Sequence, residues 1–157
     1  MLDMTDSLDV ALLTLLHDEP RVGMLEASRR LGVARGTVQA RIDRLERSGA
    51  VTGYGPDLDP AALGFAVTAF ATLEIRQGSG RAAVTGRLAA IPEVLEAHTI
   101  SGTGDVLCRL VARDNTDLQR VIDEVVAGED IVRTSTVIVL TTEVAYRTQP
   151  LLRASAG

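Results

Sequence analysis

The chain has 157 residues, of which 46% are hydrophobic and 24% are charged. This composition is typical of a globular protein with one domain or two small ones, and it excludes a disordered or collagen-like chain. No apolar stretch reaches the roughly 18 residues that a membrane-spanning helix needs, and no signal segment begins the chain, so we expect a cytoplasmic protein without a membrane partner. Its single cysteine, Cys108, excludes an intramolecular disulfide and a cysteine-based zinc site, and no metal is expected.

The net charge of −5 is unevenly distributed along the chain. Residues 1–20 carry five acidic residues and no arginine, whereas residues 21–47 carry seven arginines and three acidic residues, or +4. Residues 48–157 carry nine arginines and thirteen acidic residues, or −4. A locally basic surface attracts nucleic acid, so residues 21–47 are the segment in which DNA binding is expected.

Three short helices are predicted in the first third of the chain. Leucines recur at i, i+4, i+7 and i+8 from Leu8, which predicts the first helix. Gly32 then separates a short second helix from a third, in which Val38, Ile42 and Leu45 recur at i, i+4 and i+7. Two short helices joined at a glycine turn, with another helix behind them, are typical of a helix-turn-helix that binds DNA.

The side of the third helix opposite its apolar residues is small and polar. The major groove of DNA is about 12 Å wide and admits one helix, and Gln or Arg side chains there form paired hydrogen bonds with adenine or guanine. The alternative is a solvated basic face on an ordinary helical hairpin. The candidate DNA-binding residues are Arg35, Gly36, Thr37, Gln39, Ala40, Arg41, Arg44 and Arg47.

A second domain follows a linker rich in glycine and proline. We expect a helix-turn-helix domain over residues 1–52, a linker over 53–64 and a second domain over 65–157. Apolar residues alternate over 65–75, which predicts a strand. The later patterns predict a helix from a Ser79 cap to Pro92, strands in VLEAHTIS and DVLCRLVA around a GTG turn, a helix from Asn115 to Gly128, and a last strand from Ile131 to about Tyr146.

This order, β-α-β-β-α-β, predicts an α+β protein whose second domain is a ferredoxin-like sandwich with both helices on one face of an antiparallel sheet. The other face, carrying Phe70, Thr72, and Thr134 or its neighbours, is then open. An open face of Val, Thr and Phe residues usually packs against a partner, so we expect a homodimer through it. Two-fold pairing also suits DNA, because it presents two helices to two half-sites.

Several short segments of the chain are those of one known family: SGTGDVL, LDPAALG and the signature formed by Arg41, Ile42, Arg44, Leu45, Glu46 and Gly49. On these motifs the chain resembles the Lrp/AsnC family, the leucine-responsive and asparagine regulators, over nearly its whole length. The resemblance implies a winged helix-turn-helix, a RAM-type ligand-binding domain, a homodimer, assembly into a higher oligomer such as an octamer, and control by a small molecule that is often an amino acid. One departure is Ala34, where the family commonly has a serine that caps the recognition helix.

An amino-acid effector needs donors for its carboxylate and an acceptor for its ammonium group. Two glycines in the turn at 101–105 allow successive N–H groups to form an anion-binding nest, and Asp105 can accept the ammonium. Hydroxyls from the last strand and one histidine could complete the cavity. The alternative is a plain turn in which Asp105 caps its own backbone. The candidate effector-binding residues are Ser101, Gly102, Thr103, Gly104, Asp105, Thr134, Thr136 and His98.

The chain is expected to be a sequence-specific DNA-binding regulator without a cofactor, and not an enzyme. His98, Ser101 and Asp105 do not form a hydrolytic triad, because residues three apart on a strand point to opposite faces. Two alternatives stay open at this stage. One is an architectural DNA-binding protein without an effector, and the other is an enzyme resembling the sirohaem decarboxylases, which use the same two-domain architecture.

Overall fold

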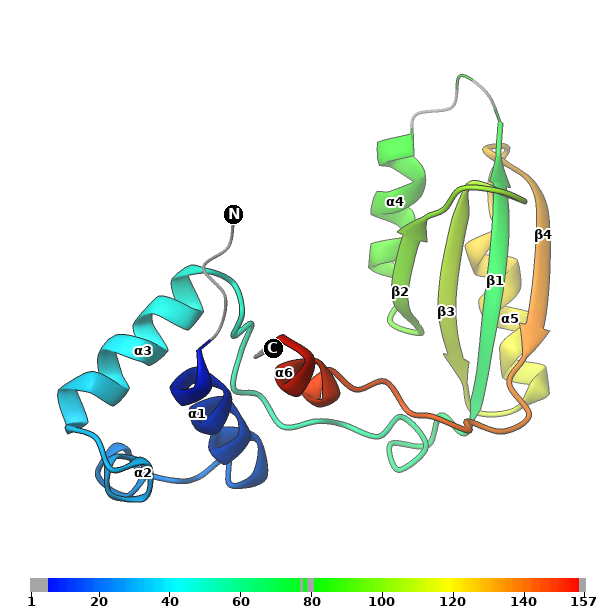
Figure 1. Ribbon diagram of the computed structural model, residues 1–157. Helices are drawn as coiled ribbons and strands as arrows, with labels where there is room; N and C mark the ends of the chain where they lie inside the picture. The colour runs from blue at the N-terminus through cyan, green and yellow to red at the C-terminus, as the bar shows by residue number, and fades with distance from the viewer. Residues whose placement is uncertain (1–5, 77, 79–80, 156–157) are drawn as a thin grey trace. The chain divides into compact units, whose positions relative to one another are not determined.

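The computed structural model describes residues 6–76, 78 and 81–155, which form two compact units (Figure 1). The first unit contains the chain up to Pro56 together with the residues from Val144 onward, and the second contains Asp57–Glu143. The end of the chain thus joins the N-terminal unit, although the sequence pattern assigned it to the second domain. The helix start predicted at Ser79 lies outside the described residues.

Three helices build the N-terminal unit around a small core: α1 (Ser7–Asp18), α2 (Met24–Leu31) and α3 (Arg35–Arg47). The three apolar residues predicted on the third helix are all buried, which confirms the period of 3.6 there. The buried core side chains are Leu12, Ala27, Val38, Ile42 and Leu45.

Local sequence explains where these helices begin and end. The Asp6 carboxylate accepts a hydrogen bond from the Asp9 backbone N–H at 3.0 Å, and the Asp9 carboxylate accepts one from the Asp6 backbone N–H at 3.2 Å, so a capping box starts α1. Gly32 ends α2 in the left-handed conformation, with φ of +67°, as expected of the turn glycine. The N-cap of α3 is Ala34, whose methyl side chain offers no acceptor.

A fourth helix of this unit, α6 (Gln149–Ser155), was not predicted. It contacts α1, and the Gln149 Nε2 donates a hydrogen bond to the Asp18 Oδ1 at 3.3 Å. Seven residues are too few for a helix to be stable in isolation, so its packing on α1 decides its structure.

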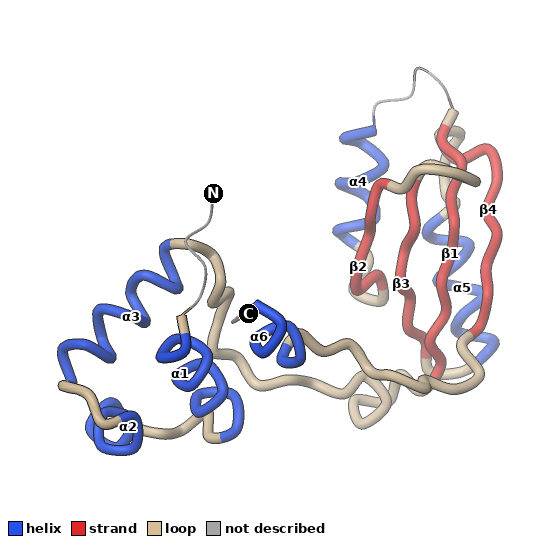
Figure 2. The backbone as a smooth tube through the Cα atoms, viewed as in Figure 1, coloured by secondary structure: helices blue, strands red, loops and turns tan. Residues whose placement is uncertain are grey.

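The second unit is the predicted antiparallel sandwich. Its strands lie in the order β2-β3-β1-β4, and every neighbouring pair is antiparallel. Figure 2 shows both helices of this unit on one side of the sheet. Its elements are β1 (Val67–Ile75), α4 (Arg81–Ala90), β2 (Val94–Thr99), β3 (Val106–Ala112), α5 (Asn115–Val125) and β4 (Ile131–Ile138).

The covered face of the sheet forms the core with the two helices. Ala69, Ala71 and Leu73 of β1 are buried there with Val84 of α4 and Val121 of α5. Their alternation along β1 is the period of two that the sequence predicted. Cys108 is also buried, and loss of solvent raises the pKa of its thiol to about 11.

The last strand differs from its prediction in length and in face. It ends at Ile138, which pairs with Ala69, and the Val139 N–H still donates to the Thr68 oxygen at 2.9 Å just beyond it. The predicted end at about Tyr146 was therefore wrong. Thr134 pairs with Leu73 and so lies on the covered face, whereas its neighbour Ser135 lies on the open face.

Candidate DNA-binding helix and effector cavity

The exposed side of α3 carries small residues, and an arginine stands at each end of the helix. Gly36 and Ala40 are exposed and small, so the backbone of this side can approach another surface closely. Arg35 stands at the first residue of α3 and Arg47 at the last, and both are exposed. Thr37 is exposed beside them.

Gln39 is also exposed and is held by its own helix, since its Nε2 donates to the Asp43 Oδ1 at 2.8 Å. This i, i+4 bond orients the amide along the helix and leaves its carbonyl oxygen as an acceptor. Small residues with Thr, Gln and Arg side chains around them are the chemistry that reads base edges and phosphates in the major groove.

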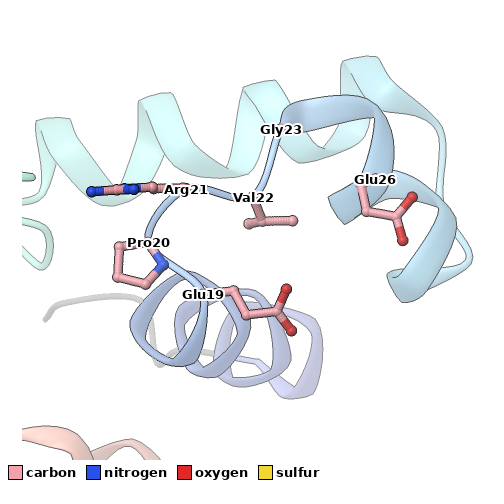
Figure 3. A pocket seen from close by; sticks show the side chains of 6 residues that line it. All are labelled: Glu19, Pro20, Arg21, Val22, Gly23 and Glu26. Carbon is pink, nitrogen blue, oxygen red and sulfur yellow. The ribbon is translucent and has the colours of Figure 1, made fainter.

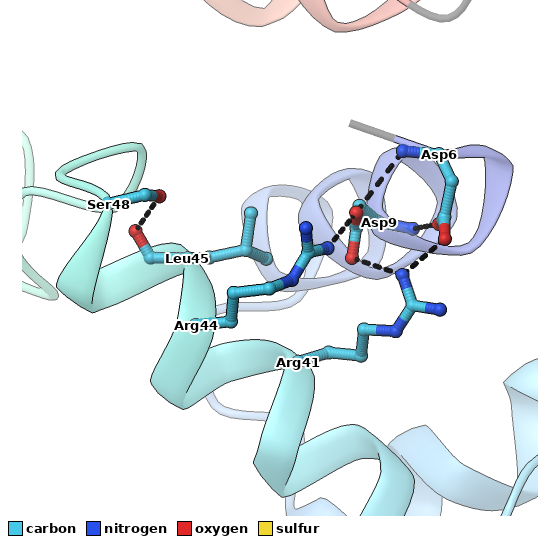
Figure 4. Close-up of polar contacts among 6 residues, drawn as sticks. All are labelled: Asp6, Asp9, Arg41, Arg44, Leu45 and Ser48. Atoms are coloured by element: carbon cyan, nitrogen blue, oxygen red, sulfur yellow. Dashed lines mark hydrogen bonds and ion pairs between the residues drawn. The ribbon is translucent and has the colours of Figure 1, made fainter. Parts of the chain in front are cut away.

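Arg41 and Arg44, also predicted to contact DNA, point at the start of α1 instead (Figure 4). The Arg41 Nη1 lies 3.1 Å from the Asp9 Oδ1 and also donates to Asp6, and the Arg44 Nη2 donates to the Asp9 Oδ2. We call Asp6, Asp9, Arg41 and Arg44 the Asp9 cluster. Asp9 itself is 0% exposed.

The charges of the Asp9 cluster reinforce one another. The N–H of Asp9 and then the Arg41 guanidinium hold the pKa of the Asp6 carboxyl below its usual range. Hydrogen bonds to Asp6 and then to Asp9 raise the pKa of Arg41 above its usual range. The Asp6 carboxylate and the Arg41 guanidinium therefore remain charged and compensate each other at neutral pH.

A cavity of about 560 Å³ lies at the connection between α1 and α2 (Figure 3). Glu19 and Glu26 both line it, and Arg30 pairs with each of them, at 3.2 Å in the case of Glu26. These acidic groups would repel phosphate and already have a cationic partner, so we assign no ligand to this cavity.

The turn at 101–105, the predicted effector loop, is bound tightly to the end of β1. The Asp105 Oδ2 accepts a hydrogen bond from the Ile75 N–H at 2.7 Å, and the Asp105 N–H donates to the Leu73 oxygen at 2.8 Å. The Asp105 carboxylate thus caps the backbone of another strand, a role between the two that the sequence left open. Gly102 and Gly104 both have positive φ, at +109° and +94°.

A small cavity of about 120 Å³ opens beside this loop on the open face of the sheet. Strands β1 and β4 place an acid and a base there, because Glu74 pairs with Arg133 across the two strands and both are exposed. Thr72 pairs with Ser135 in the same way, and each of them contributes one hydroxyl. The complete lining is Thr72, Glu74, Thr103, Gly104, Arg133 and Ser135.

The remaining predicted effector residues lie elsewhere. Thr134 and Thr136 pair with Leu73 and Ala71 on the covered face, and their buried hydroxyls have no hydrogen-bond partner within the described part of the chain. His98 lies on β2 at the opposite edge of the sheet, 3.4 Å from the Glu96 carboxylate. Strand alternation separates the two threonines from the cavity, and the strand order separates His98 from it.

Sequence reasoning missed Glu74 and Arg133. Glu74 lies in the strand predicted over 65–75 but was assigned no role there, and Arg133 carried no signal of its own. They meet because β1 and β4 pair in one particular register, across a bulge between Glu74 and Ile75.

Two family models match this chain and together cover most of it. The model of the Lrp/AsnC ligand binding domain matches residues 68–149, and a winged helix-turn-helix DNA-binding model matches residues 5–52. The chain belongs to the Lrp/AsnC family. It is a DNA-binding transcriptional regulator with the ligand-binding domain of that family.

Individual relatives support this assignment. Regulatory protein AsnC of Escherichia coli strain K12 is 27% identical over 92% of this chain and 96% of its own length. An uncharacterised HTH-type transcriptional regulator of Pyrococcus abyssi is 32% identical over 87% of this chain and 85% of its own length. These relatives are transcriptional regulators and not enzymes, which sets aside the sirohaem decarboxylase alternative.

Solved structures agree with the fold. The structure of E. coli AsnC superposes with a TM-score of 0.85 at 26% identity, covering 94% of this chain and all of that one (100%). The feast or famine regulatory protein from M. tuberculosis, complexed with L-methionine, gives 0.79 at 26% identity, covering 91% of this chain and 97% of the other. In the described residues of this Lrp/AsnC chain, no helix is long and apolar enough to cross a bilayer.

Proposed function

We propose that this Lrp/AsnC regulator reads DNA with the exposed side of α3 and that an amino acid in the Glu74–Arg133 cavity adjusts its binding. The observation that carries the first half is the exposed side of α3, where Gly36 and Ala40 lie between Arg35 and Arg47. Gly36 and Ala40 let the helix enter the groove, Thr37 and Gln39 contact bases, and the two arginines contact phosphates.

Footprinting on DNA upstream of the protein's own gene tests this assignment. Gln39→Ala and Thr37→Ala should change base preference, each by about 1–3 kcal/mol where a paired base contact is lost. Arg81→Ala, which removes an exposed arginine from α4, is the matched control and should leave the footprint unchanged. A wild-type protein that protects no DNA segment would contradict the proposed recognition surface.

The cavity supports an effector of small size and mixed charge. A free amino acid carries one ammonium and one carboxylate, and Glu74 and Arg133 offer a partner for each, with the Thr72 and Ser135 hydroxyls beside them. The volume of about 120 Å³ is well below the roughly 300–1,000 Å³ of drug-sized pockets, so a small metabolite fits best. Because a related protein from M. tuberculosis was solved with L-methionine, that amino acid is the first candidate.

Calorimetry with L-methionine and then each other amino acid tests the cavity. Glu74→Gln and Arg133→Gln should each weaken binding of the effector at least tenfold, since each removes one charge partner of the zwitterion. His98→Gln, at the far edge of the sheet, is the control and should bind as wild type does. Equal affinity in wild type and Glu74→Gln would remove this cavity from the proposal, and a wild type that binds no amino acid would favour the architectural, effector-independent function.

Self-association completes the proposed function. The open face of the sheet carries Phe70, Thr72, Ser135 and Val137 on the side away from α4 and α5, and Val137 is 62% exposed. We infer that a second copy covers this face and that dimers assemble further, to an octamer as the family resemblance implies. A dimer places two α3 helices at two half-sites of an operator.

A further inference from the structure

The Asp9 cluster joins the start of α1 to the middle of α3, two segments separated by about thirty residues of sequence. Asp9 is 0% exposed, so its carboxylate is stable only with charged partners and hydrogen bonds around it. It receives the Asp6 N–H at 3.2 Å, the Arg41 Nη1 at 3.1 Å and the Arg44 Nη2. Donors therefore occupy both oxygens of this buried group (Figure 4).

The two arginine side chains are turned toward the start of α1 and are partly buried there. Their side chains are only 29% and 35% exposed, for Arg41 and Arg44 respectively. Because residues three apart lie on neighbouring turns, both guanidiniums reach the same carboxylate next to Ile42 and Leu45, which are buried. The ion pairs and the core thus hold the same side of α3 against α1.

As a result, fewer arginines of α3 are available to contact DNA. With Arg41 and Arg44 paired, Arg35 and Arg47 remain as the exposed arginines at the ends of the helix. Arg35 and Arg47 are twelve positions apart, or about 18 Å along the axis at 1.5 Å per residue. At about 100° per residue they also differ by about 120° around the axis, so the two side chains can reach phosphates on different walls of the groove in which the helix lies.

We propose that Asp9 is a positioning residue for the recognition helix: it binds Arg41 and Arg44, fixes the seating of α3 on α1, and withholds both guanidiniums from DNA. The proposal rests on the function proposed above for α3. It reassigns two arginines that sequence alone placed among the DNA contacts. Arg35 and Arg47 are then the phosphate contacts of α3.

The salt dependence of DNA binding by the full chain separates the two groups of arginines. The logarithm of the DNA-binding constant falls as log salt rises, and each phosphate contact that is lost makes this negative slope shallower by about 0.9. Arg35→Gln and Arg47→Gln should each make the slope shallower by that amount, with an unchanged melting temperature. Arg41→Gln and Arg44→Gln should keep the wild-type slope and melt at a lower temperature. A slope that is shallower by about 0.9 in Arg44→Gln or Arg41→Gln, with wild-type melting, would overturn the assignment.

Asp9→Asn tests the positioning role directly. It should lower the melting temperature by about 5 °C or more, because it leaves two guanidiniums beside a neutral amide. At temperatures where it is folded, we expect at least tenfold weaker binding to the operator. Binding to random DNA should be unchanged or tighter, since Arg41 and Arg44 are released toward phosphates. A purely structural role would instead lower both affinities equally, which would contradict positioning.

A double-mutant cycle on melting temperature makes the test independent of DNA. Asp9→Asn combined with Arg44→Gln should melt at a higher temperature than the sum of the two single effects predicts. Additive effects would show that the Asp9–Arg44 pair holds nothing and would refute the proposal. A wild type that bound no DNA would refute the function proposed for α3, while the cycle would still decide whether Asp9 holds the helix.

Discussion

At the scale of single residues, Asp105 was predicted to bind an effector, but its carboxylate holds the backbone of β1. Its carboxylate accepts the Ile75 N–H at 2.7 Å, and its own N–H donates to the Leu73 oxygen. Both bonds tie the loop at 101–105 to the last residues of β1. Asp105→Ala should therefore loosen the loop as well as the cavity beside it, and Glu74 is the sharper probe of effector binding.

Gly104 is the residue of this loop that tolerates substitution least. A Cβ there would lie 2.4 Å from the Thr72 Cγ2 and 3.2 Å from the Leu73 oxygen, and the φ of +94° is itself strained for any other residue. We expect Gly104→Ala to lower the free energy of unfolding by about 2–4 kcal/mol in denaturant titrations.

Two other glycines provide matched controls for that measurement. Gly102→Ala meets no atom within 4 Å but has a φ of +109°, so it should cost only the backbone strain of about 1–3 kcal/mol. Gly86→Ala lies within α4 with open space around it and should stabilise the chain by about 0.5–1 kcal/mol. Equal effects of Gly104→Ala and Gly102→Ala would show that the loop moves away from Thr72 freely.

At the scale of elements, the start of α3 lacks a side chain that caps it. Ala34 occupies the N-cap with extended backbone angles of −65° and 147°, which suit a capping side chain, but a methyl group accepts no hydrogen bond. The start of α1, by contrast, has a complete capping box. The Ala34 side chain therefore caps none of the first N–H groups of α3, which water or a DNA phosphate can satisfy.

Ala34→Ser should raise the free energy of unfolding by about 1 kcal/mol, because its hydroxyl supplies the missing cap. Thermal melting of the full chain measures this gain. Ala40→Ser, an exposed position in the middle of the same helix, is the control and should lower stability by about 0.5 kcal/mol. A loss of stability in Ala34→Ser would mean that the chain before α3 cannot adopt a cap conformation with serine.

At the scale of the whole molecule, the two faces of the sheet have different roles. The face with Ala71 and Leu73 is closed by α4 and α5 and holds the core of the unit. The face with Phe70 and Val137 carries apolar groups on the side away from α4 and α5 and also carries the Glu74–Arg133 cavity. A dimer through this face would bring the proposed effector cavity close to the subunit interface, where an effector could change assembly.

Phe70→Asp should convert the dimer to monomers or aggregates and reduce DNA binding, because it would bury an unpaired carboxylate in the interface. Light scattering at several protein concentrations measures the change. Ala82→Asp places the same charge in the exposed first turn of α4 and should leave the assembly as in wild type. If Phe70→Asp retained the wild-type mass, the dimer interface would have to lie on another surface.

The sequence by itself determined the elements of this protein and the order in which they occur. Helical and strand periods are local, so the helices around Val38 and Val121 and the strand around Ala71 could be located correctly. The family signature likewise lies within one short segment, so DNA-binding regulation could be inferred before any contact was known. Helix α6 was not predicted, because a helix of seven residues depends on packing against a partner, here α1.

Only the tertiary structure decided which side chains meet. The pairing of Arg44 with Asp9 joins residues 35 positions apart, and the pairing of Glu74 with Arg133 depends on one register between β1 and β4. Neither leaves a periodic trace in the sequence, since a shift of one residue exchanges the two faces of a strand. Thr134 was misplaced for that reason, because residue type alone does not specify the register that sets its face.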